Sequence, residues 1–582
     1  MEKKENVYAK RLAALRKEMG EKGIASYLIL TGDPHHSEIP LPLFAAERKW
    51  FCPFSGDNAT LLITKDEAFL WVDGRFFISA KRELEGTPIT LMMMGEKGVK
   101  SLDELLSETR PYPLATDFSI LPFSSYKALN SLEGARIVDQ SFAYLVENAP
   151  KSASAPLFEL PLELSGEGSQ SKIARFKGQL GKAKAALITT LDDVAYLTNL
   201  RGSDIPYSPL FESFLYLGED EDVLFVSPSR VPSSFSSCRV LPLDELTSYL
   251  KRHAEVMTLL DPESCSASLA LLLPNAVFAS LPSKLMKAIK NDVEVNNTIK
   301  TQIKDGLAVF RFAVELSKAL EKGDADEWTL SEKLHELREK GEGFIEESFE
   351  TICSVGENAV MMHYAPSKES HSRITGQEPC LLLDSGGTYY GGTTDTTRTF
   401  PLNPSEEFKK DYTLTLKSLI AVSSAIFLQG AGSRCIDGLS RIHMWKQGLD
   451  YKCGTGHGVG YMSNVHEGPN SIRYKSNRDS DCPFAPGMIT TVEPGVYKEG
   501  KYGIRIENNL LCVPYAETPD GVFYRFKTIT YAPIATSCLD LSLLNEEEIN
   551  WLNAYHQEVY EALSPLATEE ELPLLKEMTK PI

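Results

Sequence analysis

Five polar residues in the second half of the chain constrain its fold most strongly. They are Asp384, Asp395, His457, Glu493 and Glu507, and each lies in a short strand-like segment framed by glycine or threonine. A fold that buried four carboxylates together would need cations to offset their repulsion. Oxygen-rich ligands favour hard divalent ions, and two neighbouring ions can activate a bridging water. The sequence therefore predicts a site for two metal ions and a hydrolytic reaction.

The segments around the two aspartates are typical of a β-hairpin. A strand that ends at Asp384 is predicted to turn at positions 386–387 and to return through Asp395, so that both carboxylates share one face. Thr393 and Thr397 have the strand parity of Asp395, which makes their hydroxyls candidate donors to the ligands. Taken alone, each aspartate is equally consistent with a turn or a helix cap.

The remaining ligand candidates lie in three short motifs. His457 is the one large polar side chain in GTGHGVG, a string that fits neither a phosphate-binding loop nor a dinucleotide fingerprint. Glu493 stands at a predicted strand end before a proline. Arg505 and Glu507 are two positions apart in a predicted strand, so their side chains share one face. The alternatives are a core histidine at position 457 and an Arg505–Glu507 ion pair on a solvated face.

Two stretches in the first half repeat one order of elements. In each, a helical pattern leads into an apolar strand and two more strands follow, with the strands at 25–30, 59–64 and 68–72 and again at 185–190, 214–217 and 223–226. A repeat over roughly 150 residues predicts duplicated α/β domains. Residues 151–172, rich in Ser, Pro and Gly, are the predicted join.

A third domain is predicted to begin with a helical pattern near residue 297. Helices at 325–340 and 404–428 alternate with the strands that carry the polar cluster, and a helix at 541–562, capped by Asn545, closes the chain. We expect an α/β and α+β multidomain fold with domains at 1–155, 156–297 and 298–582.

The composition of the chain limits the kinds of binding partner and the cellular compartment that we expect. The net charge of −20 argues against a nucleic-acid partner. The sequence contains no run of 18 apolar residues, so no membrane span is predicted. The N-terminal segment lacks the apolar core of a signal peptide. The 10 cysteines form no CxxC pair, which is typical of a reduced protein. We therefore expect a cytoplasmic enzyme.

Several motifs taken together resemble one family. DSGG followed by TTDTTRTF, GTGHGVG, NVHEGP, VEPGVY and GIRIEN are similar to the strings of the pita-bread metallopeptidases, and most of all to the three-domain Xaa-Pro aminopeptidases, also called aminopeptidase P. The resemblance extends to residues 33–38, 71–77 and 199–204 and to the C-terminal segment. It implies two creatinase-type N-terminal α/β domains followed by a pita-bread catalytic domain with a C-terminal helical extension.

The resemblance assigns metal ligands. Asp384 would chelate one ion, Asp395 and Glu507 would bridge the two ions, and His457 and Glu493 would complete the shell of the second. The ions in this family are usually Mn(II), two per subunit.

The resemblance also assigns residues to the substrate. His363 and His466 match histidines that line the substrate pocket, touch the scissile carbonyl and stabilise the tetrahedral intermediate. In isolation, His363 is equally consistent with a core histidine, and His466 would be assigned a structural role. With Glu493 as proton shuttle they form the expected catalytic set. His457 is grouped with the substrate-binding residues too, as is Arg75, which matches an arginine implicated in substrate recognition.

Two further positions carry consequences of the resemblance. Trp445 matches a tryptophan associated with dimer contacts in the long form, which implies a homodimer. Cys453 stands where many family members have histidine. That position is not a metal ligand in the family, so we expect metal binding to survive the change.

The predicted function is hydrolysis of the bond between an N-terminal residue and a penultimate proline. A prolidase-type dipeptidase is the first alternative, although prolidases usually lack the middle domain. A methionine aminopeptidase would lack the duplicated α/β region. A non-catalytic pita-bread binding protein, or a creatinase-like enzyme, would lack ligands that are all present here.

Overall fold

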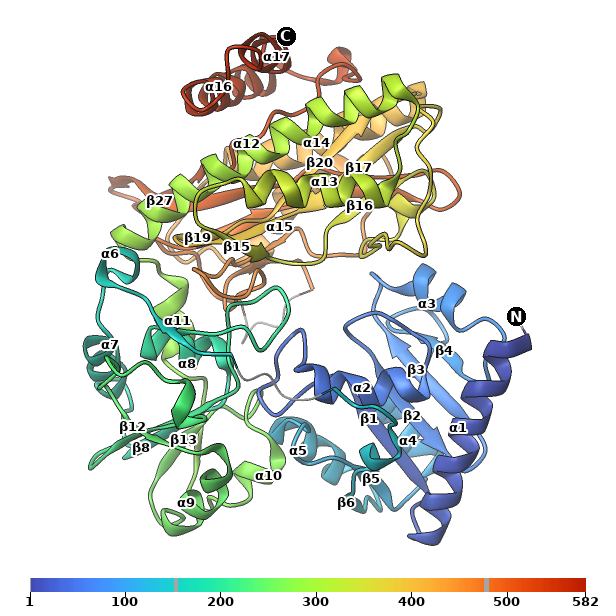
Figure 1. Ribbon diagram of the computed structural model, residues 1–582, viewed down its shortest axis with the longest axis vertical. Coiled ribbons are helices and arrows are strands. Elements are labelled where there is room, and N and C mark those ends of the chain that lie inside the picture. Colours follow the sequence, from blue (N-terminus) through green and yellow to red (C-terminus); the bar gives the residue numbers. More distant parts are fainter. Residues whose placement is uncertain (1, 151–154, 476–480) are drawn as a thin grey trace. The chain divides into compact units, whose positions relative to one another are not determined.

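The computed structural model describes residues 2–150, 155–475 and 481–582 (Figure 1). They form two compact units. The N-terminal unit comprises Met1–Leu160 and Glu167–Ser283, and the C-terminal unit comprises Pro161–Gly166 and Lys284–Ile582. Within the predicted join, residues 151–154 lie outside the described residues, and α6 (Leu162–Ser165) belongs to the C-terminal unit.

The N-terminal unit contains two six-stranded sheets of identical topology. Their strand orders are β4-β3-β2-β1-β5-β6 and β12-β11-β10-β8-β13-β14. In both sheets the two pairs along the hairpin strands are antiparallel and the other pairs are parallel. The predicted duplication of an α/β unit is confirmed at the level of strand order and direction.

The bounds of these elements follow the predicted apolar runs. The strands of the first sheet are β1 (Ser26–Leu30), β2 (Thr60–Thr64), β3 (Ala68–Val72), β4 (Thr90–Met93), β5 (Leu114–Thr116) and β6 (Ile137–Asp139). Those of the second are β8 (Ala185–Ile188), β10 (Phe214–Gly218), β11 (Asp222–Phe225), β12 (Arg239–Leu241), β13 (Thr258–Leu260) and β14 (Val277–Phe278). The helices include α1 (Glu2–Glu21), α2 (Pro42–Phe51), α3 (Phe77–Glu83), α4 (Leu102–Thr109), α5 (Phe123–Ser131), α7 (Ser169–Lys177), α8 (Leu191–Thr198) and α9 (Leu246–Arg252).

Helix α1 shows why the first sheet is stable. Its apolar side chains Leu12, Leu15 and Met19 are buried in the same core as Leu61 and Leu70 of the sheet. Spacings of three and four residues place them on one helix face. The predicted amphipathic pattern therefore covers one side of the sheet.

In the C-terminal unit, two helices cover a three-stranded sheet. Helix α12 (Asp292–Lys322) begins five residues before the predicted start, because Asn291 caps it in a capping box with Glu294. It packs with α13 (Glu327–Glu339) against β16 (Ile352–Val355), β17 (Cys380–Ser385) and β20 (Thr396–Pro401) (Figure 1). The shared core contains Phe312, Leu334 and Leu383.

A second sheet packs against α14 and α16. It has the order β21-β28-β27-β24, with β21 (Ile426–Leu428), β24 (Ile489–Val492), β27 (Asn508–Thr518) and β28 (Gly521–Thr528). Helix α16 (Glu546–Leu563) starts at Asn545 in a capping box with Glu548, as predicted for the N-cap. The helix predicted at 404–428 was too long: α14 (Glu406–Ser423) ends earlier, and β21 alternates exposed and buried side chains as an edge strand does.

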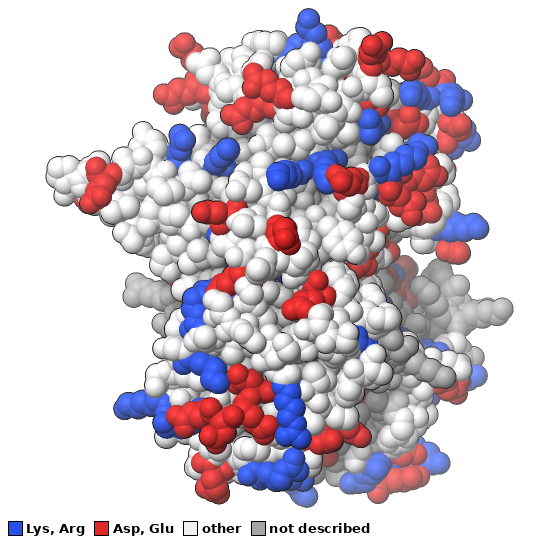
Figure 2. Space-filling view, turned by 60° about the vertical axis from the view of Figure 1, so that its left-hand side comes forward, with Lys and Arg blue, Asp and Glu red and all other residues white. Residues whose placement is uncertain are grey.

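The surface and the helices agree with a folded globular chain. On the face seen in Figure 2, acidic and basic side chains are interspersed. Among the described residues, no helix combines the length and the apolar character needed to span a bilayer.

Candidate metal centre

The two aspartates lie in the hairpin arm formed by β17 and β20. Asp384 is opposite Thr397 in this antiparallel pair, and Asp395 immediately precedes β20. The turn does not lie at 386–387 as predicted, because the chain continues through β18 (Gly387–Tyr389) and reverses at 390–391 before β19 (Gly392–Thr393). Gly386 instead permits close strand contact, since a Cβ there would lie 1.9 Å from the Thr394 carbonyl oxygen.

The glycines around His457 have the same purpose. His457 ends the short strand β22 (Gly456–His457), which pairs with β23 (Ser471–Ile472). A Cβ at Gly456 would lie 2.0 Å from the Thr491 carbonyl oxygen, and one at Gly458 would lie 2.0 Å from that of Glu467. Only glycine lets these backbones approach so closely.

Two glutamates complete the predicted set: Glu493 lies directly after a strand, and Glu507 lies directly before β27. Glu493 follows β24, and its N–H donates to the Thr455 carbonyl oxygen over 2.7 Å. Glu507 follows β26 (Tyr502–Arg505), and its N–H donates to the Thr397 carbonyl oxygen over 3.1 Å. These bonds tie both glutamates to the segments that carry the other ligands.

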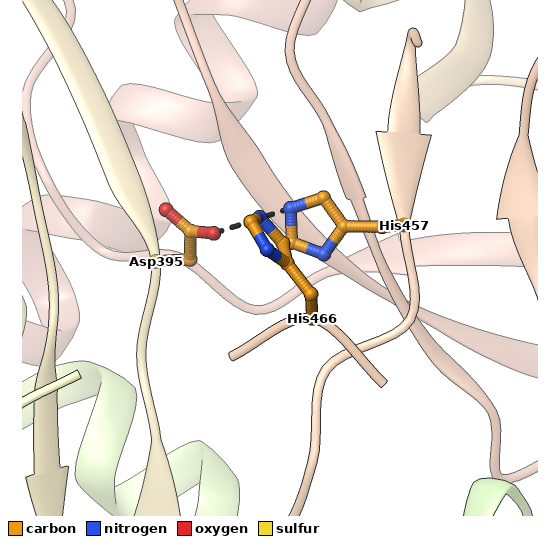
Figure 3. A group of neighbouring side chains, drawn as sticks. All are labelled: Asp395, His457 and His466. Atoms are coloured by element: carbon orange, nitrogen blue, oxygen red, sulfur yellow. Dashed lines mark ion pairs between the residues drawn. The ribbon is translucent and has the colours of Figure 1, made fainter. Parts of the chain in front are cut away.

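The structure brings all five candidate ligands together. Their ligand atoms form overlapping groups in which all atoms lie within 4.8 Å of one another: Asp384, Asp395 and Glu507 make one group, and His457, Glu493 and Glu507 another. His457 Nε2 lies 3.3 Å from Asp395 Oδ2 (Figure 3). The same nitrogen lies 3.5 Å from Glu493 Oε1. Two groups of ligand atoms that share Glu507 suit two neighbouring cations.

His457 is held in the form that binds a metal. Its Nδ1 lies 3.0 Å from the Gly458 carbonyl oxygen and donates a hydrogen to it, so the lone pair of Nε2 faces the carboxylates. Burial, and then the neighbouring His466, lower the pKa of His457 to about 4. The imidazole is therefore neutral near pH 7, as a metal ligand must be.

The carboxylates repel one another in the absence of cations. Burial and then Asp384 raise the pKa of Asp395 well above its usual range, and burial followed by Asp395 does the same for the pKa of Glu507. Burial also raises the pKa of Glu493, against the lowering effect of His457. Asp384 Oδ1 is buried without a hydrogen-bond partner among the described residues. Four crowded carboxylates and one orphaned oxygen are a donor set that fits two hard divalent ions.

Arg505 is buried beside the cluster rather than on a solvated face. Its Nη2 donates to Asp384 Oδ2 over 2.5 Å and its Nη1 to the Tyr497 hydroxyl over 2.6 Å. The suggested Arg505–Glu507 pair is therefore wrong. Glu507 Oε2 instead accepts a hydrogen bond from the Thr397 hydroxyl over 2.7 Å, as expected for a threonine that supports the ligands.

The sequence did not single out two other supporting residues. Arg398, 2% exposed, donates through Nη1 to the Glu507 carbonyl oxygen over 2.6 Å. Asn509 donates through Nδ2 to the Asp395 carbonyl oxygen. Arg398 was visible in the string TTDTTRTF, but its burial and its partners more than 100 positions away depend on how the strands pair.

The two predicted pocket histidines differ in their surroundings. The ring of His466 stands perpendicular to that of His457 at a centroid distance of 4.2 Å (Figure 3). It also forms a group of potential ligand atoms with His457 and Asp395. His466 therefore lies beside the candidate metal ligands themselves, nearer than a role in the substrate pocket would require. His363 lies on an irregular loop and is exposed, which contradicts the alternative of a core histidine.

Three predicted positions lie outside the cluster. Arg75 is in the N-terminal unit, where its Nη2 lies 2.8 Å from Asp73 Oδ2. Cys453 is half-buried, and burial raises the pKa of its thiol to about 12, so it is protonated and unreactive near pH 7. Trp445 ends α15 (Ser433–Trp445) with 45% of its surface exposed.

Known sequences match this chain over almost its full length. The profile described as Metallopeptidase family M24 matches residues 286–514, and its C-terminal region matches 522–582. Two Creatinase/Prolidase N-terminal domain profiles match 11–145 and 148–294. The Xaa-Pro aminopeptidase app-1 of Caenorhabditis elegans is 35% identical over 99% of this chain and 98% of its own length. The Probable Xaa-Pro aminopeptidase P of Talaromyces marneffei is 34% identical over 99% and 92%.

Solved structures give the same picture of the fold. An X-prolyl aminopeptidase from Caenorhabditis elegans, described as a cytosolic enzyme with a di-nuclear active site, superposes with a TM-score of 0.93 at 32% identity, covering 99% of this chain and all of its own. An Xaa-Pro dipeptidase from Bacillus anthracis reaches a TM-score of 0.50 at 21% identity and covers 63% of this chain. The second comparison supports a shared fold only.

Proposed function

The chain belongs to the Xaa-Pro aminopeptidases of metallopeptidase family M24, and we propose that it releases the N-terminal residue from peptides with proline at position two. The observation that carries this proposal is the complete cluster of Asp384, Asp395, His457, Glu493 and Glu507, in which Glu493 is half-buried and the other four are buried. Relatives of that name match almost the full chain. The proposed domains are 1–155, 156–297 and 298–582.

The five clustered residues are the proposed metal ligands. When bound, two divalent ions would supply a water of lowered pKa and polarise the scissile carbonyl. A set of four carboxylates and one imidazole favours a hard ion, and Mn(II) is our choice. Arg505 and Thr397 fix the orientation of Asp384 and Glu507 through the hydrogen bonds described above.

The proposed proton transfers involve Glu493. Its carboxylate lies beside His457 and the other ligands, so it can take a proton from the attacking water and deliver it to the leaving proline nitrogen. That nitrogen must be protonated before it can leave. His363 and His466 are proposed as N–H donors to the oxygen of the scissile carbonyl as negative charge develops on it. His457 and Arg75 are kept as further proposed contacts to the substrate.

We propose a cytoplasmic homodimer that uses the exposed face of α15. Leu439, Ile442 and Trp445 lie on this helix, and each is between 41% and 45% exposed. Their spacing of three residues places them on one side of the helix. An exposed apolar stripe of this kind is typical of a contact surface.

A substrate series tests the activity. The purified protein is stripped of metal with a chelator, reloaded with Mn(II) and assayed on Arg-Pro-Pro, Ala-Pro and Met-Ala-Ser. Release of arginine that depends on the metal supports the proposal. Cleavage of Ala-Pro alone would instead identify a prolidase, and cleavage of Met-Ala-Ser a methionine aminopeptidase. Inactivity on all three, with no bound metal, would identify a binding protein.

A further inference from the structure

A buried carboxylate outside the metal cluster organises the loop that carries His363. Glu327 is the first residue of α13 and is fully buried. Its two oxygens accept hydrogen bonds from the last residue of β16 and from three residues of the loop that follows it. The donors are the N–H of Val355 (2.8 Å), Nδ2 of Asn358 (3.1 Å to each oxygen), the hydroxyl of Tyr364 (2.7 Å) and the N–H of Ser372 (2.7 Å).

These donors enclose a segment with little regular structure. Between β16 and β17 the described chain contains one short 3-10 turn, at Asn358–Val360, and isolated bridges. Strand ladders therefore do little to fix the position of residue 363. Glu327 binds both ends of the segment, since its own N–H also donates to the Ser372 carbonyl oxygen over 3.0 Å. One helix start thus sets the entry and the exit of the loop.

The contacts reach both neighbours of His363. Tyr364, on one side, donates its hydroxyl to Glu327. Met362, on the other side, accepts through its carbonyl oxygen from Arg505 Nη2 at 3.4 Å, and the same Nη2 donates to Asp384. His363 is therefore anchored between the buried carboxylate and the arginine that holds a metal-ligand candidate.

Helix capping does not explain the carboxylate of Glu327. Asp326 is already the N-cap of α13, accepting from the N–H of Thr329 over 2.6 Å. All four of these side-chain and backbone donors to Glu327 are uncharged groups. A side chain that only filled space here would not need two oxygens that both accept hydrogen bonds.

We propose that Glu327 is a positioning residue for His363, holding the loop so that the imidazole meets the scissile carbonyl. The proposal rests on the proposed function only for the role of His363. Its structural content, control of the loop by one carboxylate, does not depend on the reaction.

Glu327→Gln tests the proposal with the least change of shape. Both carboxylate oxygens face donors, so the amide NH2 must oppose at least one of them. We expect kcat for Arg-Pro-Pro to fall about 10-fold or more with KM nearly unchanged, because an interaction of the transition state is lost. Tyr364→Phe removes one donor and should give a smaller loss in the same direction. If Glu327→Gln does not fold, Tyr364→Phe alone still tests the proposal.

The decisive comparison uses a His363→Asn background. If Glu327 acts through His363, adding Glu327→Gln to that background should cost little more, whereas equal losses in both backgrounds would overturn the proposal. Glu548→Gln is the matched control, since Glu548 is also a buried glutamate in the first turn of a helix, paired with Lys417. It should lower stability without changing kcat.

Two readouts do not depend on turnover. Manganese affinity measured by calorimetry should be unchanged in Glu327→Gln, and a weakened affinity would indicate a general structural role instead. The imidazole NMR signal of His363, assigned with His363→Asn, should shift or broaden in Glu327→Gln and Tyr364→Phe but not in Glu548→Gln. An unmoved signal would overturn the proposal even if the protein proved inactive on every peptide.

Discussion

At the residue scale, the side chain of Asp395 links two groups of potential ligand atoms in the site. It belongs to the group with Asp384 and Glu507 and to the group with His457 and His466. Asp395→Asn should therefore lower kcat by more than the roughly 10–100-fold loss that is typical of residues that only support a ligand. Steady-state kinetics and metal analysis check this. Asp411→Asn, a buried aspartate bonded to the Tyr502 hydroxyl, is the control. Activity retained in Asp395→Asn would refute its bridging role.

A second residue-scale prediction concerns pH and the N-terminal unit. Glu47 is 6% exposed and accepts a hydrogen bond from the Tyr27 hydroxyl over 2.7 Å. Burial raises its pKa from 4.5 to about 7. Between these values the folded state keeps a proton that the unfolded state releases, so the free energy of unfolding decreases as pH rises from about 4.5 to 7.

Glu47→Gln should abolish that dependence. At pH 8 the variant should be more stable than the parent by an amount approaching about 3 kcal/mol, since each pKa unit corresponds to about 1.4 kcal/mol. At pH 4 the two should be equally stable. Denaturant unfolding of the N-terminal unit at both pH values measures this. A stability difference that is the same at both pH values would show that folding does not raise the pKa of Glu47.

The ligands themselves were predictable from sequence, whereas their supports were not. Each ligand sits in a local string whose glycines mark close backbone contact, as at Gly456 and Gly458. The bond from Arg505 to Asp384 crosses 121 positions, and that from Thr397 to Glu507 crosses 110. Such contacts are set by strand register, which no local pattern specifies.

At the element scale, a buried ion pair fixes the loop that carries His466. Lys290 Nζ lies 2.7 Å from Glu467 Oε1, and the two side chains are 1% and 3% exposed. The Glu467 N–H also donates over 2.8 Å to the Gly458 carbonyl oxygen, the same oxygen that accepts from His457 Nδ1. The pair thus links the start of α12 to both imidazoles of Figure 3.

Breaking one side of this pair should cost more than removing both. Lys290→Met leaves the Glu467 carboxylate buried and unpaired, which should lower the free energy of unfolding by about 3–5 kcal/mol. Lys290→Met with Glu467→Leu removes the orphaned charge and should recover much of that loss. Denaturant unfolding of the C-terminal unit compares the three proteins. An equal cost in the single and double variants would show that the two charges are not coupled.

Helix and strand boundaries were predicted best where a single local interaction determines them. Asn545 marked the start of α16 correctly, because a cap is a local hydrogen-bonding choice. The end of α14 was missed, since the apolar run through Ile426 suits a helix or a strand equally. Pairing of Ile426 with Arg525 in β28 decided it, and that partner is far along the chain.

At the scale of the whole molecule, the duplicated sheets were evident from sequence because each copy repeats the same order of apolar strands. The oligomeric state is a property of the surface, and it depends on where exposed side chains gather. Leu439, Ile442 and Trp445 form an apolar stripe on α15, and Trp445 also contacts Tyr474 edge to face at 6.1 Å. This stripe is the basis of the proposed dimer.

The last prediction tests that dimer. Light scattering after size exclusion should give about twice the chain mass of 64.5 kDa for the parent protein. Trp445→Glu places a charge in the proposed apolar contact, where its desolvation is unfavourable, and should give monomers. Leu271→Glu, at an exposed apolar residue of the N-terminal unit, should leave the mass unchanged. A parent that elutes as a monomer, or a Trp445→Glu variant that stays dimeric, would exclude α15 as the contact surface, because a buried glutamate without a partner would destabilise any such interface by several kcal/mol.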